Sequence, residues 1–159
     1  MDMQTGRYPL PLRKAGSLLH GLSMDRQPSK SPAIRVTAMP ADANFHGDVF
    51  GGWIMSMMDL AAGNVASRRC RGRAVTAAID AVAFHHPVHI GDELSIYADV
   101  IAVGRTSMRL AVEAWQRDRD SDRTSKVTEA IFVFVAIDAE SKPRVVPPEM
   151  GSVSSVSVG

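Results

Sequence analysis

The hydrophobic pattern of the chain indicates one long helix near its middle. Residues 53–69 are rich in Met, Leu and Ala and poor in β-branched side chains, a composition typical of helices. At 1.5 Å per residue, a helix of ~17–19 residues spans roughly 26–28 Å. Apolar residues occur on nearly every side of this helix, so we expect other parts of the structure to enclose it.

Strand patterns lie on both sides of this helix. Residues 34–39 form a short strand candidate that Pro40 stops. Four longer candidates follow the helix, and in the second of them apolar and polar residues alternate with a period of two. These four are residues 75–88, 94–102, 108–114 and 127–137. Short turns connect them, which favours antiparallel pairing of consecutive strands.

One apolar helix and one long antiparallel sheet predict an α+β domain in which the sheet curls around the helix. This arrangement is the hotdog fold. Strands with apolar residues on both faces, such as residues 131–135, indicate that sheet edges pair between subunits. We therefore expect an oligomer.

The chain length of 159 residues fits one domain. Residues 33–148 carry all the predicted elements and form this domain. Residues 1–32 contain four prolines and several basic side chains, and we expect them to be a flexible N-terminal extension. Residues 149–159 are rich in Ser, Val and Gly, and we expect a disordered C-terminal tail.

Composition and charge exclude several classes of protein. The chain is 45% hydrophobic and 22% charged, as globular domains are, and its net charge of +1 gives no global field that would attract nucleic acid. The helix is too short to span a bilayer and no secretion signal precedes it, so we expect a cytoplasmic protein without a membrane contact. The lone Cys70 excludes an internal disulfide. His85, His86 and His89 match no strong metal-ligand spacing, so we expect no metal.

Asp59 is the most informative residue of the predicted helix. Its neighbours are apolar, and an isolated carboxylate is costly to desolvate, so it must be paired, protonated or directed into a cleft. Helical spacing places Ser56, Asp59 and Gly63 on one stripe, where a groove of small and polar residues could admit a ligand. The alternative is an aspartate at an exposed turn, or one that caps a neighbouring loop.

A Gly51-Gly52 pair stands where the helix is expected to begin. The first backbone N–H groups of a helix have no partner within it, and the helix dipole reinforces them, so they suit a developing oxyanion. Asp59 follows two turns later, within plausible reach of a substrate held there. Glycines also serve simply to allow a tight turn.

At these residues the sequence resembles a known family. The pattern Asn44-x2-Gly47-x2-Phe50-Gly51-Gly52-x6-Asp59 is similar to the signature of hotdog-fold acyl-CoA thioesterases of the YciA type, which are related to vertebrate cytosolic acyl-CoA thioesterases. The resemblance covers about residues 36–148. It continues through Val75-Thr76, Phe84-x2-Pro87-x3-Gly91-Asp92, Gly104-x-Thr106-Ser107 and Glu129-Ala130.

The resemblance implies hydrolysis of the acyl-CoA thioester to free fatty acid and CoA, hence a role in fatty acid metabolism. It assigns Asp59 as the catalytic carboxylate, either general base or nucleophile, and Asn44 as a residue that completes the site from the facing subunit. Gly51 and Gly52 would polarise the thioester oxygen through their N–H groups. The family also implies at least a dimer, and a hexamer built of three dimers, with CoA entering as part of the substrate and no other cofactor.

Further residues are candidates for binding the substrate. Arg68, Arg69, Arg71 and Arg73 could bind the phosphates of CoA, or could stay solvated and complement the helix dipole. Ser56 is a candidate because of its place on the Asp59 stripe. Thr76 and Ser107 are candidates because they lie within the matched motifs.

Two other functions remain open beside the thioesterase. A hotdog module that binds acyl-CoA as a sensor, without catalysis, would have no need for a carboxylate beside the thioester. A hotdog hydratase would require an Asp/His pair placed for proton transfer, and no histidine lies at helical spacing from Asp59. A thiolate leaves readily because a free thiol has a pKa near ~8.5, so one carboxylate and an oxyanion hole can suffice for hydrolysis.

Overall fold

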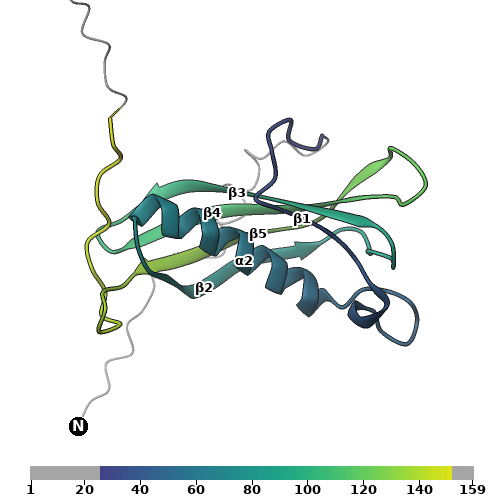
Figure 1. Cartoon of the computed structure of the whole chain (residues 1–159), viewed down its shortest axis with the longest axis horizontal. Helices are drawn as coiled ribbons and strands as arrows, with labels where there is room; N and C mark the ends of the chain where they lie inside the picture. The colour runs from purple at the N-terminus through teal and green to yellow at the C-terminus, as the bar shows by residue number, and fades with distance from the viewer. Residues whose placement is uncertain (1–25, 152–159) are drawn as a thin grey trace, which may run out of the picture.

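The computed structural model describes residues 26–151 and contains one long helix against a five-stranded sheet. The strands run in the spatial order β1-β3-β4-β5-β2, and every neighbouring pair is antiparallel. The helix α2 lies across one face of the sheet (Figure 1). This confirms the predicted α+β hotdog architecture. The elements are β1 (Ile34–Thr37), η1 (Pro40–Asp42), α2 (Gly51–Cys70), β2 (Ala74–Phe84), β3 (Glu93–Val103), β4 (Ser107–Arg117) and β5 (Thr124–Ala136).

The prediction that all consecutive strands are neighbours is wrong for β2 and β3. β2 lies at the sheet edge beside β5, and residues 85–92 cross the end of the sheet to reach β3. The crossing backbone is hydrogen-bonded to three different segments on the way: residue 85 donates to Val127, Val88 accepts from Val49, and Gly91 donates to Ala38, over 2.7–2.9 Å. Because these bonds hold the connection to β5, to the loop before α2 and to the residue after β1, it needs no hairpin.

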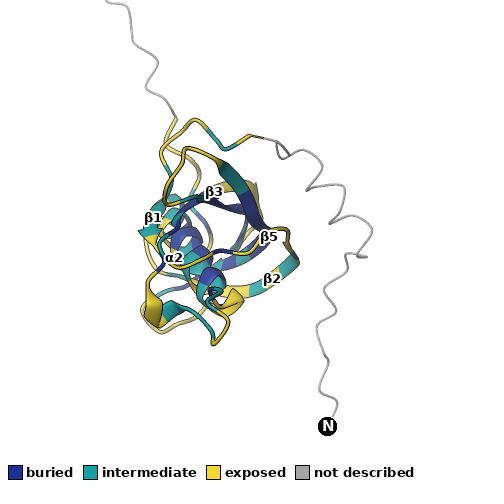
Figure 2. Ribbon diagram, turned by 90° about the vertical axis from the view of Figure 1, so that its right-hand side faces the viewer, coloured by how far each residue is buried: buried dark blue, intermediate teal, exposed yellow. Residues whose placement is uncertain are grey.

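The helix is enclosed on one side only. Its buried side chains pack against the inward residues of the sheet, which curves around this side of α2 (Figure 2). The opposite side is open, and Leu60 is 54% exposed there. The expected complete enclosure is therefore not achieved within one chain, because five strands curve around only part of the helix. The buried helix residues are Ile54, Met58, Ala61, Ala62, Ala66 and Cys70.

The edge strand β2 is unusually apolar for an edge. Its ladder with β5 is irregular at two places, and Ala81 within the second of them has a positive φ of 52°. The large apolar side chains Val75, Ile79, Val82 and Phe84 are 39–52% exposed. Such an edge suits pairing with another chain.

The structure also reaches into the predicted terminal segments. Gln27 donates to the Tyr97 hydroxyl over 2.9 Å and Lys30 pairs with Asp99, so residues 26–32 contact β3. The remaining part of the predicted extension, residues 1–25, lies outside the described residues, as does most of the predicted tail, residues 152–159.

Candidate active site

The start of α2 exposes backbone donors. Phe50 is the N-cap in an extended conformation, and within the described residues no side chain caps the helix there. The carbonyl of Phe50 accepts from the N–H groups of Trp53 and Ile54, which leaves those of Gly51 and Gly52 among the free first donors of the helix. Both glycines are exposed, and a Cβ on Gly52 would meet nothing within 4 Å. A carbonyl oxygen can therefore approach these donors without obstruction.

Asn44 lies in a tightly bonded loop just before the helix. Its side-chain oxygen accepts from the backbone N–H of His46 at 2.9 Å and of Asp48 at 3.2 Å. The turn closes at Gly47, whose φ of 85° suits glycine, through a bond to the Asn44 carbonyl. The Asp48 carboxylate pairs with His89 at 3.0 Å and so ties the loop to the crossing segment. This network occupies the oxygen of the Asn44 amide and leaves its NH2 group as the donor for a ligand.

Asp59 is held by the edge strand. The Thr76 hydroxyl of β2 donates to one oxygen of the Asp59 carboxylate, which is half-buried. Among the described residues no cation pairs with Asp59, so its second oxygen is not committed to an ion pair. The carboxylate is thus oriented by a neutral donor at the open side of the helix, beside the exposed part of β2.

The geometry separates Asp59 from the helix start. Asp59 follows Gly51 by eight positions in α2, which is about 12 Å along the axis. Reacting atoms must approach to about 3–3.5 Å, so one thioester cannot reach both groups of the same chain. The expectation that Asp59 lies within reach of a substrate at its own helix start is therefore wrong, because α2 is one continuous helix from Gly51 to Cys70.

Comparisons with known proteins identify the family of the chain. The sequence profile of the Thioesterase superfamily matches residues 46–122. The chain is 53% identical to an uncharacterized acyl-CoA thioester hydrolase of Zymomonas mobilis, over 76% of this chain and 81% of that protein. It is 40% identical to the acyl-CoA thioester hydrolase YciA of Escherichia coli, over 77% of this chain and 95% of YciA. The chain belongs to the YciA family of hotdog acyl-CoA thioester hydrolases.

Solved structures give the same assignment of the fold. The structure described as the hexameric thioesterase of Yersinia pestis superposes with a TM-score of 0.73 at 39% identity, over 77% of this chain and 100% of that chain. A structure described as a hexameric hotdog fold thioesterase of Campylobacter jejuni has a TM-score of 0.70 at 35% identity, over 74% of this chain and 91% of that chain.

The ligand groove predicted along the stripe of Ser56, Asp59 and Gly63 on α2 is only partly formed. The sequence predicts Thr76 only as a substrate-binding residue. Its hydrogen bond to Asp59 depends on how α2 packs against β2, and no local sequence pattern reveals this packing. The Ser56 hydroxyl donates to the Trp53 carbonyl of its own helix at 2.7 Å. Gly63 lies under the Phe134 ring, where a Cβ would be 3.6 Å from a ring carbon. Among the described residues, the Ser56 hydroxyl is thus committed to its own helix, and Gly63 lies against an aromatic ring.

We expect Thr76→Val to lower kcat about tenfold while KM changes little. A hydrogen bond to a charged group contributes about 1.5–3 kcal/mol, and without it the Asp59 carboxylate is free to rotate. Thr76→Ser keeps the hydroxyl and should restore kcat. The measurement is steady-state acyl-CoA hydrolysis by the two variants and the wild type. Loss of activity in Thr76→Ser but not in Thr76→Val would show that the methyl group, not the hydrogen bond, is what matters.

The arginines around the end of α2 bind the chain itself. Arg69 donates to the Pro147 carbonyl at 2.6 Å, Arg71 to Pro148 at 3.2 Å, and Arg73 to Asp138 at 3.2 Å. These contacts favour a structural role for the three guanidinium groups, which hold the C-terminal segment against the helix. Arg68 is exposed.

Ser107 lies near the same end of the molecule, at the start of β4. The Ser107 carbonyl accepts from the N–H of Gly104 in the β3–β4 turn. The carbonyl of the preceding residue, Thr106, accepts from the N–H of Ala136. The substrate-binding candidates Arg68, Arg73 and Ser107 are thus close to the end of α2, whereas Asn44, Gly51 and Gly52 are at its start. Thr76 and Asp59 lie between the two groups.

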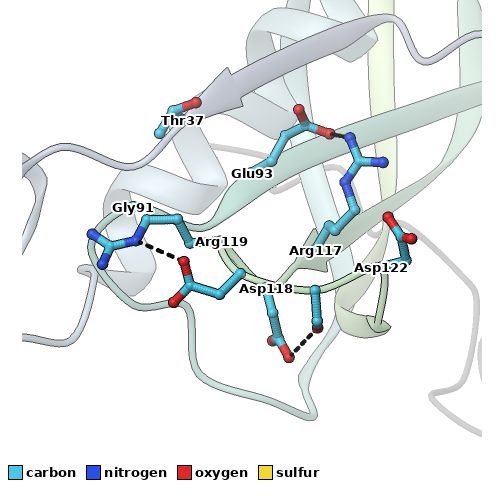
Figure 3. Close-up of a pocket in the computed structure, with 9 residues that line it drawn as sticks. Thr37, Gly91, Glu93, Arg117, Asp118, Arg119 and Asp122 are labelled. Carbon is cyan, nitrogen blue, oxygen red and sulfur yellow. Dashed lines mark hydrogen bonds and ion pairs between the residues drawn. The ribbon is translucent and has the colours of Figure 1, made fainter.

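A charged depression of about 490 Å³ lies where β4 and β5 are joined (Figure 3). Four carboxylates and only two guanidinium groups line it, and Glu93 already binds Arg117 at 2.5 Å. The excess of negative charge disfavours the phosphates of CoA. The charged lining residues are Glu93, Arg117, Asp118, Arg119, Asp120 and Asp122.

Asp118 in this depression should make stability depend on pH. Its pKa is lowered from the ordinary value, chiefly because Arg123 donates a hydrogen bond to it, with further bonds from Gln116 and Ser121. A lowered folded-state pKa stabilises the fold at neutral pH, and this stabilisation is lost as the pH falls through that pKa. We expect Asp118→Asn to be less stable than wild type at neutral pH, with the difference shrinking as the pH falls through the lowered pKa of Asp118 in urea unfolding. Asp122→Asn is the control, and an equal loss there would contradict the assignment.

Neither a metal centre nor a membrane span is found in residues 26–151. No three His, Cys, Asp or Glu side chains in this range are close enough together to hold a metal ion. No helix in the same range is both long and apolar enough to cross a membrane.

Proposed function

We propose that this protein is an acyl-CoA thioesterase that hydrolyses the thioester to free fatty acid and CoA. The observation that carries the proposal is the Asp59 carboxylate, oriented by Thr76 on the open side of α2. A sensor that only binds acyl-CoA has no need for an oriented carboxylate at this place. A hydratase would need a histidine near Asp59, and the described contacts of Asp59 include none.

In the proposed reaction, the N–H groups of Gly51 and Gly52 polarise the thioester oxygen and stabilise the oxyanion that develops on it. Asp59 either takes a proton from the attacking water or attacks the carbonyl carbon itself, and water then releases the acid. In both routes the C–S bond breaks, water supplies the new C–O bond, and the CoA thiolate leaves. Since a thiolate with a pKa near ~8.5 is a good leaving group, we propose that no metal or cofactor takes part beyond the CoA of the substrate.

The reaction centre is proposed to form between two chains. The separation of about 12 Å between Gly51 and Asp59 prevents one chain from supplying both groups. The exposed apolar edge β2 offers a surface for a second copy, which would bring its Asn44 loop and helix start to Asp59. Because solved relatives are described as hexameric, we propose a hexamer made of three such dimers.

Two further proposals concern the setting of the enzyme. A single free cysteine, buried at the end of α2, supports a cytoplasmic location, where fatty acid metabolism would supply acyl-CoA. Among the candidates for the CoA phosphates, exposed Arg68 is favoured, since its neighbours Arg69, Arg71 and Arg73 already bind backbone carbonyls.

The test is release of free thiol from a panel of acyl-CoAs by the purified protein, followed with a thiol reagent. Thiol release above the uncatalysed rate, with saturation by substrate, supports the thioesterase. Tight binding of acyl-CoA with no thiol release from any member would instead support the sensor.

A further inference from the structure

A second cavity lies beside the start of α2, apart from the charged depression. It has a volume of about 290 Å³ and is lined by both the helix and the segment that crosses from β2 to β3. Its floor is apolar and belongs to the core, because Val49, Ile54 and Val88 are only 1–7% exposed. The volume is near the lower limit for ligand pockets, roughly 300–1,000 Å³. The complete lining is Val49, Gly51, Ile54, Phe84, His85, His86, Pro87 and Val88.

This cavity adjoins the proposed oxyanion donors. Gly51 lines it, and the Phe84 ring would lie 3.4 Å from a Cβ placed on Gly51. A thioester oxygen bound to the Gly51 N–H therefore puts the carbonyl carbon at the mouth of the cavity. Of the two substituents on that carbon, the acyl chain is the apolar one and matches the floor of Val49, Ile54 and Val88.

The rim of the cavity is polar and fixed. His86 binds the Lys126 carbonyl at 2.9 Å, and His85 lies 3.6 Å from the Glu129 carboxylate. Lys126 and Glu129 are themselves buried and bonded to each other at 2.9 Å, so the two imidazoles are anchored to β5. A chain that continued past this rim would replace water around anchored polar groups, which is unfavourable. The cavity thus suits an acyl group that ends inside it.

We propose that this cavity binds the acyl chain of the substrate and that Phe84 sets the chain length, in favour of short acyl groups. The inference rests on the proposed thioesterase function and goes beyond it by naming the substrate class and the residue that selects it. Phe84 is well placed for this role because its ring forms the wall next to Gly51 while its outer face is 52% exposed. Removing the ring widens the cavity beside Gly51.

The experiment compares kcat/KM for butyryl-CoA and octanoyl-CoA in the wild type, Phe84→Ala and Phe84→Leu. We expect the wild type to prefer butyryl-CoA. Phe84→Ala should raise the octanoyl-to-butyryl ratio about tenfold, since pocket walls discriminate single methylene groups by at least this factor. Phe84→Leu should lie between the two. Val103→Ala is the matched control, because Val103 is a similarly exposed apolar side chain of β3 that does not line the cavity, and its ratio should be that of the wild type.

A structural defect alone would leave the octanoyl-to-butyryl ratio of kcat/KM unchanged. Damage to the sheet edge or to the oxyanion donors lowers both rates together, and an unchanged ratio in Phe84→Ala would overturn the proposal. An equal rise of KM for both substrates would also overturn it, by assigning the cavity to the part of CoA that all substrates share.

A second measurement separates this inference from the proposed function. Thioether analogues, S-butyl-CoA and S-octyl-CoA, cannot be hydrolysed, so their affinities can be measured by calorimetry whether or not the protein is an enzyme. The same shift towards the longer chain in Phe84→Ala supports the acyl cavity even if no thiol is released. Normal hydrolysis with no shift in either measurement refutes the cavity assignment and leaves the thioesterase intact.

Discussion

Asp59→Asn should lower kcat for acyl-CoA hydrolysis by at least about 10²-fold, because positioned proton transfer contributes roughly 10²–10⁴-fold to enzymatic rates. The amide keeps the size of the side chain and can still accept the hydrogen bond from Thr76, but it can act neither as a base nor as a nucleophile. The measurement is the rate of thiol release at saturating substrate. Affinity for CoA should stay close to that of the wild type, since Asp59 is proposed to act on the reacting carbonyl and not on the nucleotide.

A matched control is Asp99→Asn. Asp99 is an exposed carboxylate on β3 that pairs with Lys30, so its replacement changes the net charge equally without touching the site. We expect wild-type turnover from this variant and unchanged circular dichroism spectra from both. Near-normal turnover in Asp59→Asn, with the fold retained, would show that Asp59 is not the catalytic carboxylate.

Local patterns in the sequence were sufficient to predict most elements of the fold. The period-two alternation in residues 94–102 marks β3, and the composition of residues 53–69 marks α2, because side-chain periodicity depends only on the geometry of each element. The helix begins two residues earlier than predicted, at Gly51, since glycines there cost little when the backbone donors remain exposed. The packing of the sheet against the helix then follows from the need to bury one apolar helix.

The order of the strands in the sheet was harder to predict from the sequence than their positions along the chain. Nothing in residues 85–92 distinguishes a hairpin from a crossing, because the decisive hydrogen bonds go to Val49, Val127 and Ala38, which are distant in sequence. The bond between Thr76 and Asp59 was missed for a similar reason. It depends on the register of an irregular edge strand and on the packing of α2, and both are set by the whole domain.

For the candidate site too, the sequence identifies the reactive residues but not the distances between them. Spacing identified an asparagine, a glycine pair and a carboxylate as one group, and the structure keeps Asn44 next to the helix start through the loop that ends at Val49. About two turns of α2 separate the helix start, and Asn44 beside it, from Asp59. The residues of the signature therefore cannot meet within one chain. This separation supports the proposal that the signature describes two halves of a site that an assembly brings together.

This division leads to a prediction for mixed assemblies. Asn44→Ala subunits and Asp59→Ala subunits should each be inactive alone, and an equal mixture should recover about a quarter of wild-type activity if the dimer is symmetric. In a mixed dimer, one site receives the intact Asn44 and the intact Asp59 from opposite chains, while the other site receives both alanines. Random pairing makes half of the dimers mixed, and each of these has one working site of two, which gives the quarter.

Exchange of subunits must be demonstrated for this result to be decisive. Differently tagged subunits are mixed, and their dimers are weighed by native mass spectrometry before and after the activity assay. The exposed edge of β2, where Val75 and Ile79 stand out, is the surface on which exchange would occur if the two chains pair there. Recovered activity that rises in step with the mixed species would establish the shared site. Complete exchange without recovery would mean that Asn44 and Asp59 act in the same chain, or that Asn44 is dispensable, and the separation along α2 would then require a different explanation.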